Sequence, residues 1–185
     1  SATMDYVTIV TDANAADFGD ITLGRSGPGT ANDATRGIIA GGYQSSGSLG
    51  VNIIDYITIA TPGNAIDFGD LTVARNNLCG AGDGTYATFA GGASQWSGTK
   101  YNTIDYITVQ TTGNATDFGD ITNATWQIGG SGNSTTGFCA GGRSDLTNYE
   151  TTIEYWTFAT PSNATDFGDL TQGGWMPSAS SGNAS

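Results

Sequence analysis

Apolar and polar side chains alternate in short runs along this chain, which is the pattern of half-buried β-strands. The clearest run, residues 4–9, reads Met-Asp-Tyr-Val-Thr-Ile. Its β-branched and aromatic residues favour strands, and no stretch shows the i, i+3, i+4 spacing of an amphipathic helix. Strong helix formers are scarce, with two Glu and one Lys in the whole chain. The pattern therefore predicts an all-β protein.

The strand-like run recurs at a fixed period, which identifies the chain as a tandem repeat. Copies begin at residues 4, 54, 104 and 153, so the periods are 50, 50 and 49 residues. An Asp-Phe-Gly-Asp motif keeps the same phase at 17–20, 67–70, 117–120 and 166–169. A strand-like segment ending in Ala-Gly-Gly keeps it at 38–42, 88–92 and 138–142. One period thus holds about four short strands.

Turn-forming residues connect these strands at 61–64, 111–114 and 161–163. We expect their Gly and Asn residues to adopt the positive φ of tight hairpins. The Asp that closes each Phe-Gly-Asp is expected to accept backbone N–H bonds in the adjoining turn.

A period of about 50 residues with four antiparallel strands is typical of a β-propeller blade. The order of a Gly-Gly doublet, a variable loop, a Tyr strand, a turn and an aromatic resembles the kelch repeat. Gly41-Gly42, Tyr56 and Phe68 occupy these phases, and Arg75 follows where kelch repeats often carry Arg. Every copy has Phe where kelch repeats have Trp. The resemblance covers the whole chain and implies a kelch-like β-propeller, but it leaves the function open.

The near-identity of the copies carries a second resemblance. The segment beginning Ile-Asp-Tyr-Ile-Thr-Ile is similar to repeats in virion-associated proteins of marine bacteriophages, which are tail-fibre, head-fibre or decoration components. This resemblance implies a place on the surface of a virion. It also implies partners among other virion proteins, further copies of the chain, or a host surface glycan.

We expect residues 1–185 to form a single propeller domain. Its last unit, 153–185, has 33 residues against a period near 50, so the phase predicts three full blades and a split, incomplete one. A missing strand would leave an unpaired edge. The chain is then expected to be a segment of a longer propeller, or to receive the strand from a partner chain.

The charge excludes some partners. Seventeen Asp and Glu face five Lys and Arg, a formal net charge of −12, so no basic stripe is available for nucleic acid or an anionic membrane surface. No apolar run is long enough for a membrane helix, so membrane insertion is not expected. Three Asp or Glu phases, each present in four copies, hold 12 of the 17 acidic residues. The acidity therefore reflects the copied design rather than an acidic binding site.

Candidate chemistry is sparse. The absence of His removes the commonest general base and metal ligand, which favours a non-enzymatic protein without a cofactor. The pair Asp17 and Asp20 has glycosidase-like chemistry, but four copies of it indicate architecture. Calcium stays open because Asp, Asn and carbonyl oxygens suit it, although no Asp-x-Asp-x-Asp-Gly loop is present. Cys79 and Cys139 are expected to be buried free thiols.

Binding residues are sought where the copies differ, in the polar loops 43–53, 93–103 and 143–152. Aromatic rings on such loops suit stacking on sugars or packing against a partner protein, unless each ring folds back on its own blade. The candidates, aromatic or cationic, are Tyr43, Trp96, Lys100, Tyr101, Arg143 and Tyr149.

A second difference between the copies lies just before the Gly-rich strands. Trp126 and Trp175 share one phase with Ser26 and Asn76, which directly follow Arg25 and Arg75. We interpret the arginines as hydrogen-bond donors between blades and the tryptophans as replacement fillers.

These observations predict a non-enzymatic virion module that contacts a partner protein or host glycan through its variable loops. The alternative is a purely structural decoration or fibre-forming protein without a ligand. A propeller-type glycan-active enzyme is the third reading.

Overall fold

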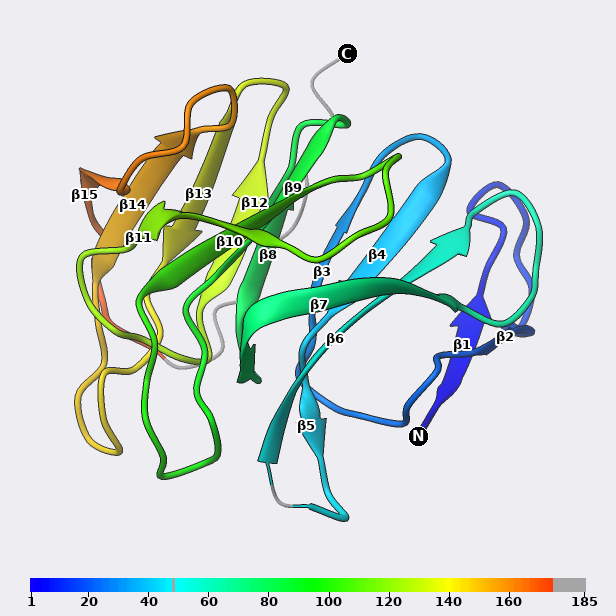
Figure 1. The fold of residues 1–185 in the computed structure, drawn as a ribbon, viewed down its shortest axis with the longest axis horizontal. Helices are drawn as coiled ribbons and strands as arrows, with labels where there is room; N and C mark the ends of the chain where they lie inside the picture. The colour runs from blue at the N-terminus through cyan, green and yellow to red at the C-terminus, as the bar shows by residue number, and fades with distance from the viewer. Residues whose placement is uncertain (48, 175–185) are drawn as a thin grey trace.

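The computed structural model describes residues 1–47 and 49–174, and within these ranges the chain forms fifteen strands and no helix (Figure 1). The strands assemble into four antiparallel sheets of two to five strands. The all-β prediction is therefore confirmed. In the same part of the chain, no helix exists that could cross a membrane.

Three of the sheets repeat one strand order, which runs from a Gly-rich strand through the Ala-Gly-Gly and Asp-Tyr strands to the Phe-Gly-Asp strand. Sheet II contains β3 (Gly29–Asn32), β4 (Arg36–Ala40), β6 (Leu49–Thr58) and β7 (Ile66–Arg75), with the short β5 (Tyr43–Gln44) also paired to β6. Sheet III contains β8 (Cys79–Gly82), β9 (Tyr86–Ala90), β10 (Thr103–Thr108) and β11 (Thr116–Asp120). Sheet IV contains β12 (Gly129–Gly132), β13 (Thr136–Ala140), β14 (Thr152–Thr157) and β15 (Thr165–Asp169).

Sheet I has only the two outer strands, β1 (Thr3–Tyr6) and β2 (Ala16–Asp20). It lies at one end of the row of sheets, and β14 and β15 lie at the opposite end (Figure 1). The Gly-rich strands form the inner edge, where β8 contacts both β3 and β12. A pocket of about 280 Å³ is lined by these three strands and the residues just before them. The four strands expected in each period are thus present, although each sheet combines strands from two neighbouring repeat units.

The same aromatic pair stands on one face of every sheet. A β-bulge leaves the Phe of each Phe-Gly-Asp without a partner in the strand register, for example Phe68 between the Ile54–Gly69 and Asp55–Asp67 pairs. The Phe ring then meets the Tyr ring of the neighbouring strand edge-on, with centroids 6.1 Å apart for Tyr56 and Phe68. Such a bulge turns a side chain toward a chosen face of the sheet.

These aromatic faces pack against the next sheet along the row. Phe68 and Leu71 of sheet II are buried in one cluster with Ile107 of β10 in sheet III and with Val109, which directly follows β10. One period later, Phe118 and Ile121 are buried against Trp156 and Phe158. Each sheet therefore turns the side that carries its Phe-Gly-Asp phenylalanine, here called the Phe face, toward the next sheet of the row. Its Ile, Val or Trp side chains lie toward the sheet before it. We call each such contact between two successive sheets a joint. Burial of these large apolar side chains is the main stabilising contribution at each joint.

Backbone and asparagine hydrogen bonds reinforce the joints. The N–H of Asp70 donates to Asn114 Oδ1 (3.1 Å), and the N–H of Ala115 donates back to the Asp70 carbonyl (2.8 Å). Equivalent bonds link Asp20 to Asn64 and Asp120 to Asn163. The turn asparagines do not have positive φ, so that prediction is wrong for them. Their side chains instead bridge neighbouring sheets.

A second correction concerns the carboxylates of the Phe-Gly-Asp strands. The first Asp of the motif accepts a backbone N–H, as Asp17 does from Gly19 (3.1 Å), and Asp117 and Asp166 repeat this bond. The closing Asp contributes its backbone N–H to the joint described above. The Asp that accepts the local backbone N–H is therefore the first Asp of the motif and not the closing one.

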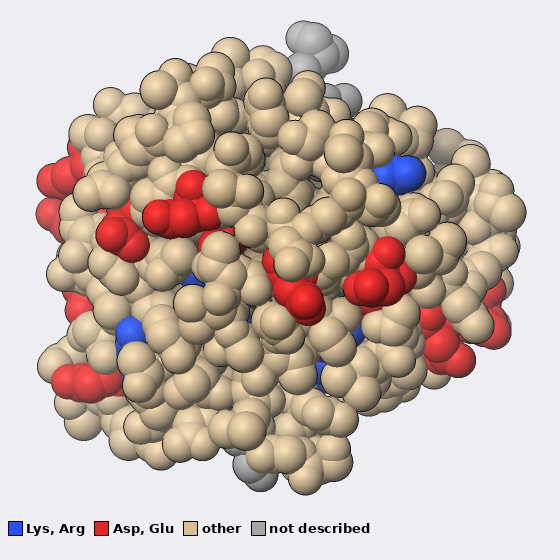
Figure 2. All heavy atoms as spheres, viewed as in Figure 1, with Lys and Arg blue, Asp and Glu red and all other residues tan. Residues whose placement is uncertain are grey.

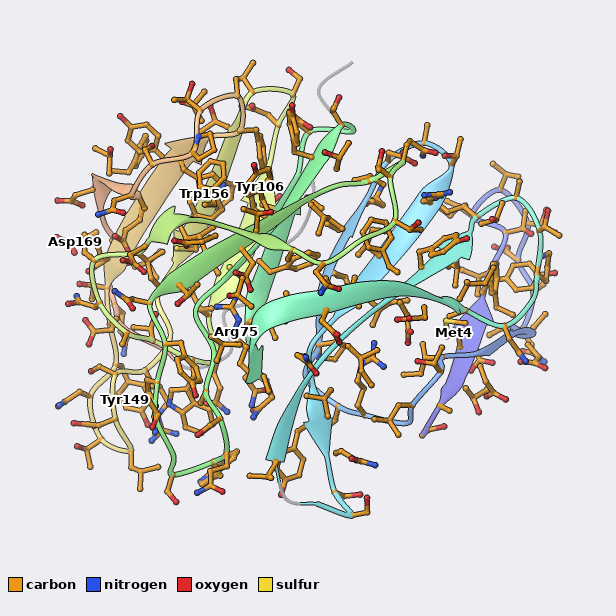
Figure 3. All side chains as sticks on the ribbon, viewed as in Figure 1. Met4, Arg75, Tyr106, Tyr149, Trp156 and Asp169 are labelled. Carbon is orange, nitrogen blue, oxygen red and sulfur yellow. The ribbon has the colours of Figure 1, made fainter. Side chains whose placement is uncertain are left out.

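Two buried ion pairs also cross the joints, as the arginine interpretation predicts. Arg75 Nη2 lies 2.8 Å from Asp105 Oδ2, and its guanidinium donates to the carbonyls of Phe89, Gly91 and Thr103. Arg25 makes the equivalent pair with Asp55 at 3.0 Å, and in both pairs the side chains are fully buried. Arg75 stands at the centre of the molecule in Figure 3.

The Gly-Gly doublets mark a close approach between two backbone segments of the chain. Gly41 has φ 63°, and a Cβ placed on it would overlap the carbonyl oxygen of Arg75. Gly91 repeats the arrangement, with φ 68° and the carbonyl of Thr125. Both the backbone conformation and the contact require glycine. The expectation that the doublets allow close backbone approach is confirmed.

Both cysteines are free and buried, as predicted. A hydrogen bond with Cys79, together with burial, raises the pKa of Cys139 well above its ordinary value. The Cys139 thiol therefore stays protonated near neutral pH, and protonated thiols are poor nucleophiles.

Gly80 tests the packing of the inner strands. Its Cα faces β3 so closely that a Cβ would overlap the carbonyl oxygen of Thr30. We expect Gly80→Ala to lower the free energy of unfolding by about 1–3 kcal/mol, because the inner strands must separate to admit the methyl group. Urea titration followed by far-UV circular dichroism measures the change. Gly63→Ala is the control, since no atom lies within 4 Å of its added Cβ; equal stability of the two variants would contradict this packing.

Candidate binding site on the loop face

The three variable loops emerge from the same edge of the molecule, at the bottom of Figure 1. Each loop is anchored by a short antiparallel bridge to the segment before the Gly-rich strand of the same sheet. These bridges join Ser26 to Tyr43, Asn76 to Ala93, and Trp126 to Arg143. The repeated strands therefore bring the variable loops next to the segments around residues 26, 76 and 126, which also differ between the copies.

Trp126 is the centre of the loop cluster. Its side chain is fully buried, and the Trp96 ring meets it edge-on with centroids 4.9 Å apart. Lys100 Nζ lies 5.1 Å from the centre of the Trp126 ring, and the Arg143 guanidinium carbon lies 5.8 Å from it. Arg143 also stacks over Tyr149, at 5.2 Å. Trp126 thus fills the space between loops 93–103 and 143–152, as the filler interpretation predicts.

The cations of this cluster are partly withdrawn from water. Arg143 is 7% exposed. Burial lowers the pKa of Lys100, Asp145 opposes this shift, and the positive charge of Arg143 adds to it. Lys100 Nζ donates to the carbonyl of Gly98 (2.7 Å). These two cations therefore hold the loops together over the Trp126 ring, where cation–π attraction stabilises them.

A pocket of about 590 Å³ lies beside this cluster, between loops 43–53 and 93–103. Its aromatic walls are Tyr43, which is half-buried, and Trp96, which is 55% exposed. Its remaining lining is small or carries side-chain amides, and consists of Ser26, Gly27, Asn76, Asn77 and Gln127. Aromatic rings opposite amide groups can stack on an apolar sugar face and hydrogen-bond its hydroxyls.

The amide-bearing wall has an unusual backbone. Asn77 and Gln127 have φ of 53° and 55°, at the phase where Gly27 has 61°. The left-handed conformation is unfavourable for residues with a side chain, and strained positions of this kind cluster at functional sites. A chain of backbone bonds holds it, from Asn77 N–H to the Gly27 carbonyl and from Gln127 N–H to the Asn77 carbonyl. The buried Gln127 Oε1 accepts no hydrogen bond from the described residues.

The candidates from the sequence fall into two groups and one outlier. Tyr43 and Trp96 line the pocket, whereas Lys100 and Arg143 lie over Trp126 and Tyr149 lies against Arg143. Tyr149 is 46% exposed and projects from the loop end of the molecule (Figure 3). Tyr101 is half-buried and donates its backbone N–H to the Gly92 carbonyl, away from the pocket lining.

Sequence reasoning missed the amide wall of the pocket. Asn77 and Gln127 stand at a phase where the copies have Gly, Asn and Gln, so the variation between copies carried the signal. Trp175, the other tryptophan at the Trp126 phase, lies outside the described residues.

The acidic side chains do not assemble a metal site. Figure 2 shows them as separate groups spread over one face of the molecule. Within residues 1–47 and 49–174, no three His, Cys, Asp or Glu side chains are grouped so that they could hold a metal ion. A calcium ion would therefore depend on carbonyl and amide oxygens, and the turn asparagines already serve the joints between sheets.

Comparison with known proteins gives no family assignment: no protein-family model matches the chain, and no curated protein is significantly similar in sequence.

Proposed function

We propose that this chain is a non-enzymatic binding module that holds a carbohydrate, most simply a host surface glycan, in the pocket between Tyr43 and Trp96. The observation that carries the proposal is the composition of that pocket, which is lined by two aromatic rings and three residues with side-chain amides. Two of these amides are on strained left-handed backbone. An exposed Trp ring is an energetic anchor in many binding sites.

The scaffold of this module is proposed to be a kelch-like β-propeller. Three sheets with one strand order, Gly-rich strands along the inner edge and a glycine doublet in each repeat support this assignment. A virion surface location, on a fibre or decoration protein, is proposed from the resemblance of the repeats to phage virion proteins. The absence of His from the chain supports a binding rather than a catalytic role.

A glycan array, followed by titration calorimetry with the best-retained glycan, tests the binding function. Trp96→Ala and Tyr43→Ala are each expected to weaken binding by about tenfold or more, because each removes a stacking surface from the pocket. Tyr149→Ala is the matched control, since Tyr149 is an exposed loop aromatic outside the pocket lining. Failure of every glycan to bind, or equal loss in all three variants, would reject the proposal.

A purely structural role is the second candidate, and one specific observation favours it. Large apolar side chains are exposed at both ends of the row of sheets, among them Ile9 at 96% and Phe167 at 72%. Exposed apolar side chains at both ends of the molecule are suited to contacts with other proteins.

A further inference from the structure

The last sheet of the row carries an uncovered Phe face. Phe167 of β15 is 72% exposed, whereas its equivalents Phe68 and Phe118 are each 3% exposed. Phe138 of β13 is 40% exposed, whereas Ile38 and Thr88 at its phase are 1% and 0% exposed. With Asn133, Thr136, Ile153 and Tyr155, the two rings line a pocket of about 550 Å³. In sheets II and III this face is covered by the Asp-Tyr strand of the next sheet.

The first sheet carries the complementary uncovered face. Val7 and Ile9 are 59% and 96% exposed. At the same phases, Ile107 and Val109 are 4% and 0% exposed, and Trp156 and Phe158 are each 2% exposed. Those equivalents are buried because they insert against the Phe face of the preceding sheet. Val7 and Ile9 are therefore the apolar half of a joint whose Phe half is not supplied by the described residues.

The two ends also carry the polar groups that form the hydrogen bonds of a joint. Asn14 and Ala15 stand at the phases of Asn64 and Ala65, which bond the closing Asp of the preceding sheet. Asp169 is the closing Asp of sheet IV. The exposed Asp5 stands at the phase of the fully buried Asp55 and Asp105.

A threonine completes this set of groups. Inside the chain, Thr72 donates its backbone N–H and its hydroxyl to Asp105, at 3.2 and 2.5 Å, and Thr22 makes the same two bonds to Asp55. Thr171 stands at this phase beyond sheet IV and is exposed. The two ends of the molecule thus carry the two complementary halves of the hydrogen-bonding groups of a standard joint.

We infer that a second copy of this chain docks head to tail, with its β1–β2 sheet seated on the Phe face of sheet IV. Val7 and Ile9 of the second copy enter the pocket beside Phe138 and Phe167. The Asp169 N–H then donates to Asn14 of the second copy, and Thr171 donates to its Asp5. The occupant is argued from continuity, because these contacts reproduce ones that the chain already makes. The asparagine bond occurs three times, and the apolar and the threonine contacts each occur twice.

The first joint of the chain shows that a two-stranded sheet can form one half of such a contact, there the half with the Phe face. Sheet I has only β1 and β2, yet Phe18 is 8% exposed where sheet II covers it, and Asp20 bonds Asn64 across the contact. Met4 and Asp169 mark the two ends, on opposite sides of Figure 3. A contact between unlike ends is heterologous, so it repeats from copy to copy until a ring closes or a filament grows.

Complementary variants test the head-to-tail geometry. Ile9→Asp blocks only the first end and Phe167→Asp blocks only the last end, and both side chains are exposed, so folding is expected to persist. Analytical ultracentrifugation of the 185-residue chain should show concentration-dependent assembly. Each variant alone should raise the dissociation constant by roughly tenfold or more. An equimolar mixture of the two should form dimers and stop there, because one intact head meets one intact tail.

Salt gives a second readout. Each copy carries a formal net charge of −12, so added salt should strengthen the association by screening repulsion. Leu146→Asp, at an exposed position of loop 143–152, is the control and should assemble like the unmodified chain. A chain that stays monomeric at all concentrations overturns the inference, as does a variant mixture that fails to dimerise. The inference does not rest on glycan binding, and Trp96→Ala should leave the assembly unchanged.

Discussion

Replacing Arg75 by methionine is expected to lower the free energy of unfolding by about 3–5 kcal/mol, because it leaves the Asp105 carboxylate buried without its partner. Both side chains are fully buried in the native structure. The substitution also leaves the carbonyls of Phe89, Gly91 and Thr103 without the guanidinium donor. Unsatisfied buried acceptors add to the destabilisation. Urea titration, with the slope compared between variants, measures the loss.

Two further variants separate the charge from the packing. Arg36→Met is the control, because Arg36 is half-buried, stacks over Tyr56 at 4.4 Å and donates to the Val109 carbonyl. Its loss is expected to cost about 1 kcal/mol. Adding Asp105→Asn to Arg75→Met should restore part of the stability, since the remaining side chain is then neutral. Equal effects of Arg75→Met and Arg36→Met would show that the buried pair has no special role at the joint.

The third joint, between sheets III and IV, has no arginine at this position. Thr125 occupies the Arg75 phase there, and Glu154 occupies the Asp105 phase. Glu154 is 4% exposed and accepts the backbone N–H of Thr122 (2.7 Å). The neighbouring Trp126 fills volume where the other copies have Ser26 and Asn76. The joints are therefore interchangeable in shape but differ in how they satisfy the buried carboxylate.

Trp126→Ala is the second large expected effect, with a loss of about 3–5 kcal/mol in the free energy of unfolding. The ring is fully buried and is in contact with Trp96, Lys100 and Arg143. Its removal leaves a cavity under two loops and takes away the surface on which both cations stack. The near-UV circular dichroism that arises from the edge-on Trp96–Trp126 contact should disappear together with the stability.

Trp126→Phe is the matched control for this prediction. The buried Nε1 of Trp126 has no hydrogen-bond partner among the described residues, so phenylalanine loses volume but no bond there. We expect it to retain most of the stability and the ordered loops. If Trp126→Ala were as stable as Trp126→Phe, the loops would be held by their own turns and not by the ring beneath them.

The sequence was sufficient for the repeated part of the molecule. The period, the Gly-Gly doublets and the Asp-Tyr runs predicted four strands per repeat, because strand propensity and repeat phase are local properties. The side-chain bridges of Asn64, Asn114 and Asn163 were not predicted. A turn residue seen in one strand pair gives no sign that its amide will meet the next sheet.

The site was predicted less completely, for a similar reason. Tyr43 and Trp96 were found because their loops differ between copies, but their shared pocket depends on how two neighbouring sheets sit side by side. Asn77 and Gln127 looked like ordinary polar residues. Their left-handed backbone is set by hydrogen bonds between successive Gly-rich segments, over spacings of about one repeat.

The asparagine bridges between sheets have a consequence for how the molecule comes apart. Each joint connects only neighbouring sheets, and the asparagine bridge is common to all three joints. The free energy of unfolding therefore accumulates joint by joint along the row. Loss of structure should begin by fraying at sheet I, which lacks inner strands, and proceed inward. Because the joints are independent, the number of repeat units can change by duplication. The sequence of each loop can change while the contacts between the sheets stay the same. Selection can therefore act on recognition and on length separately.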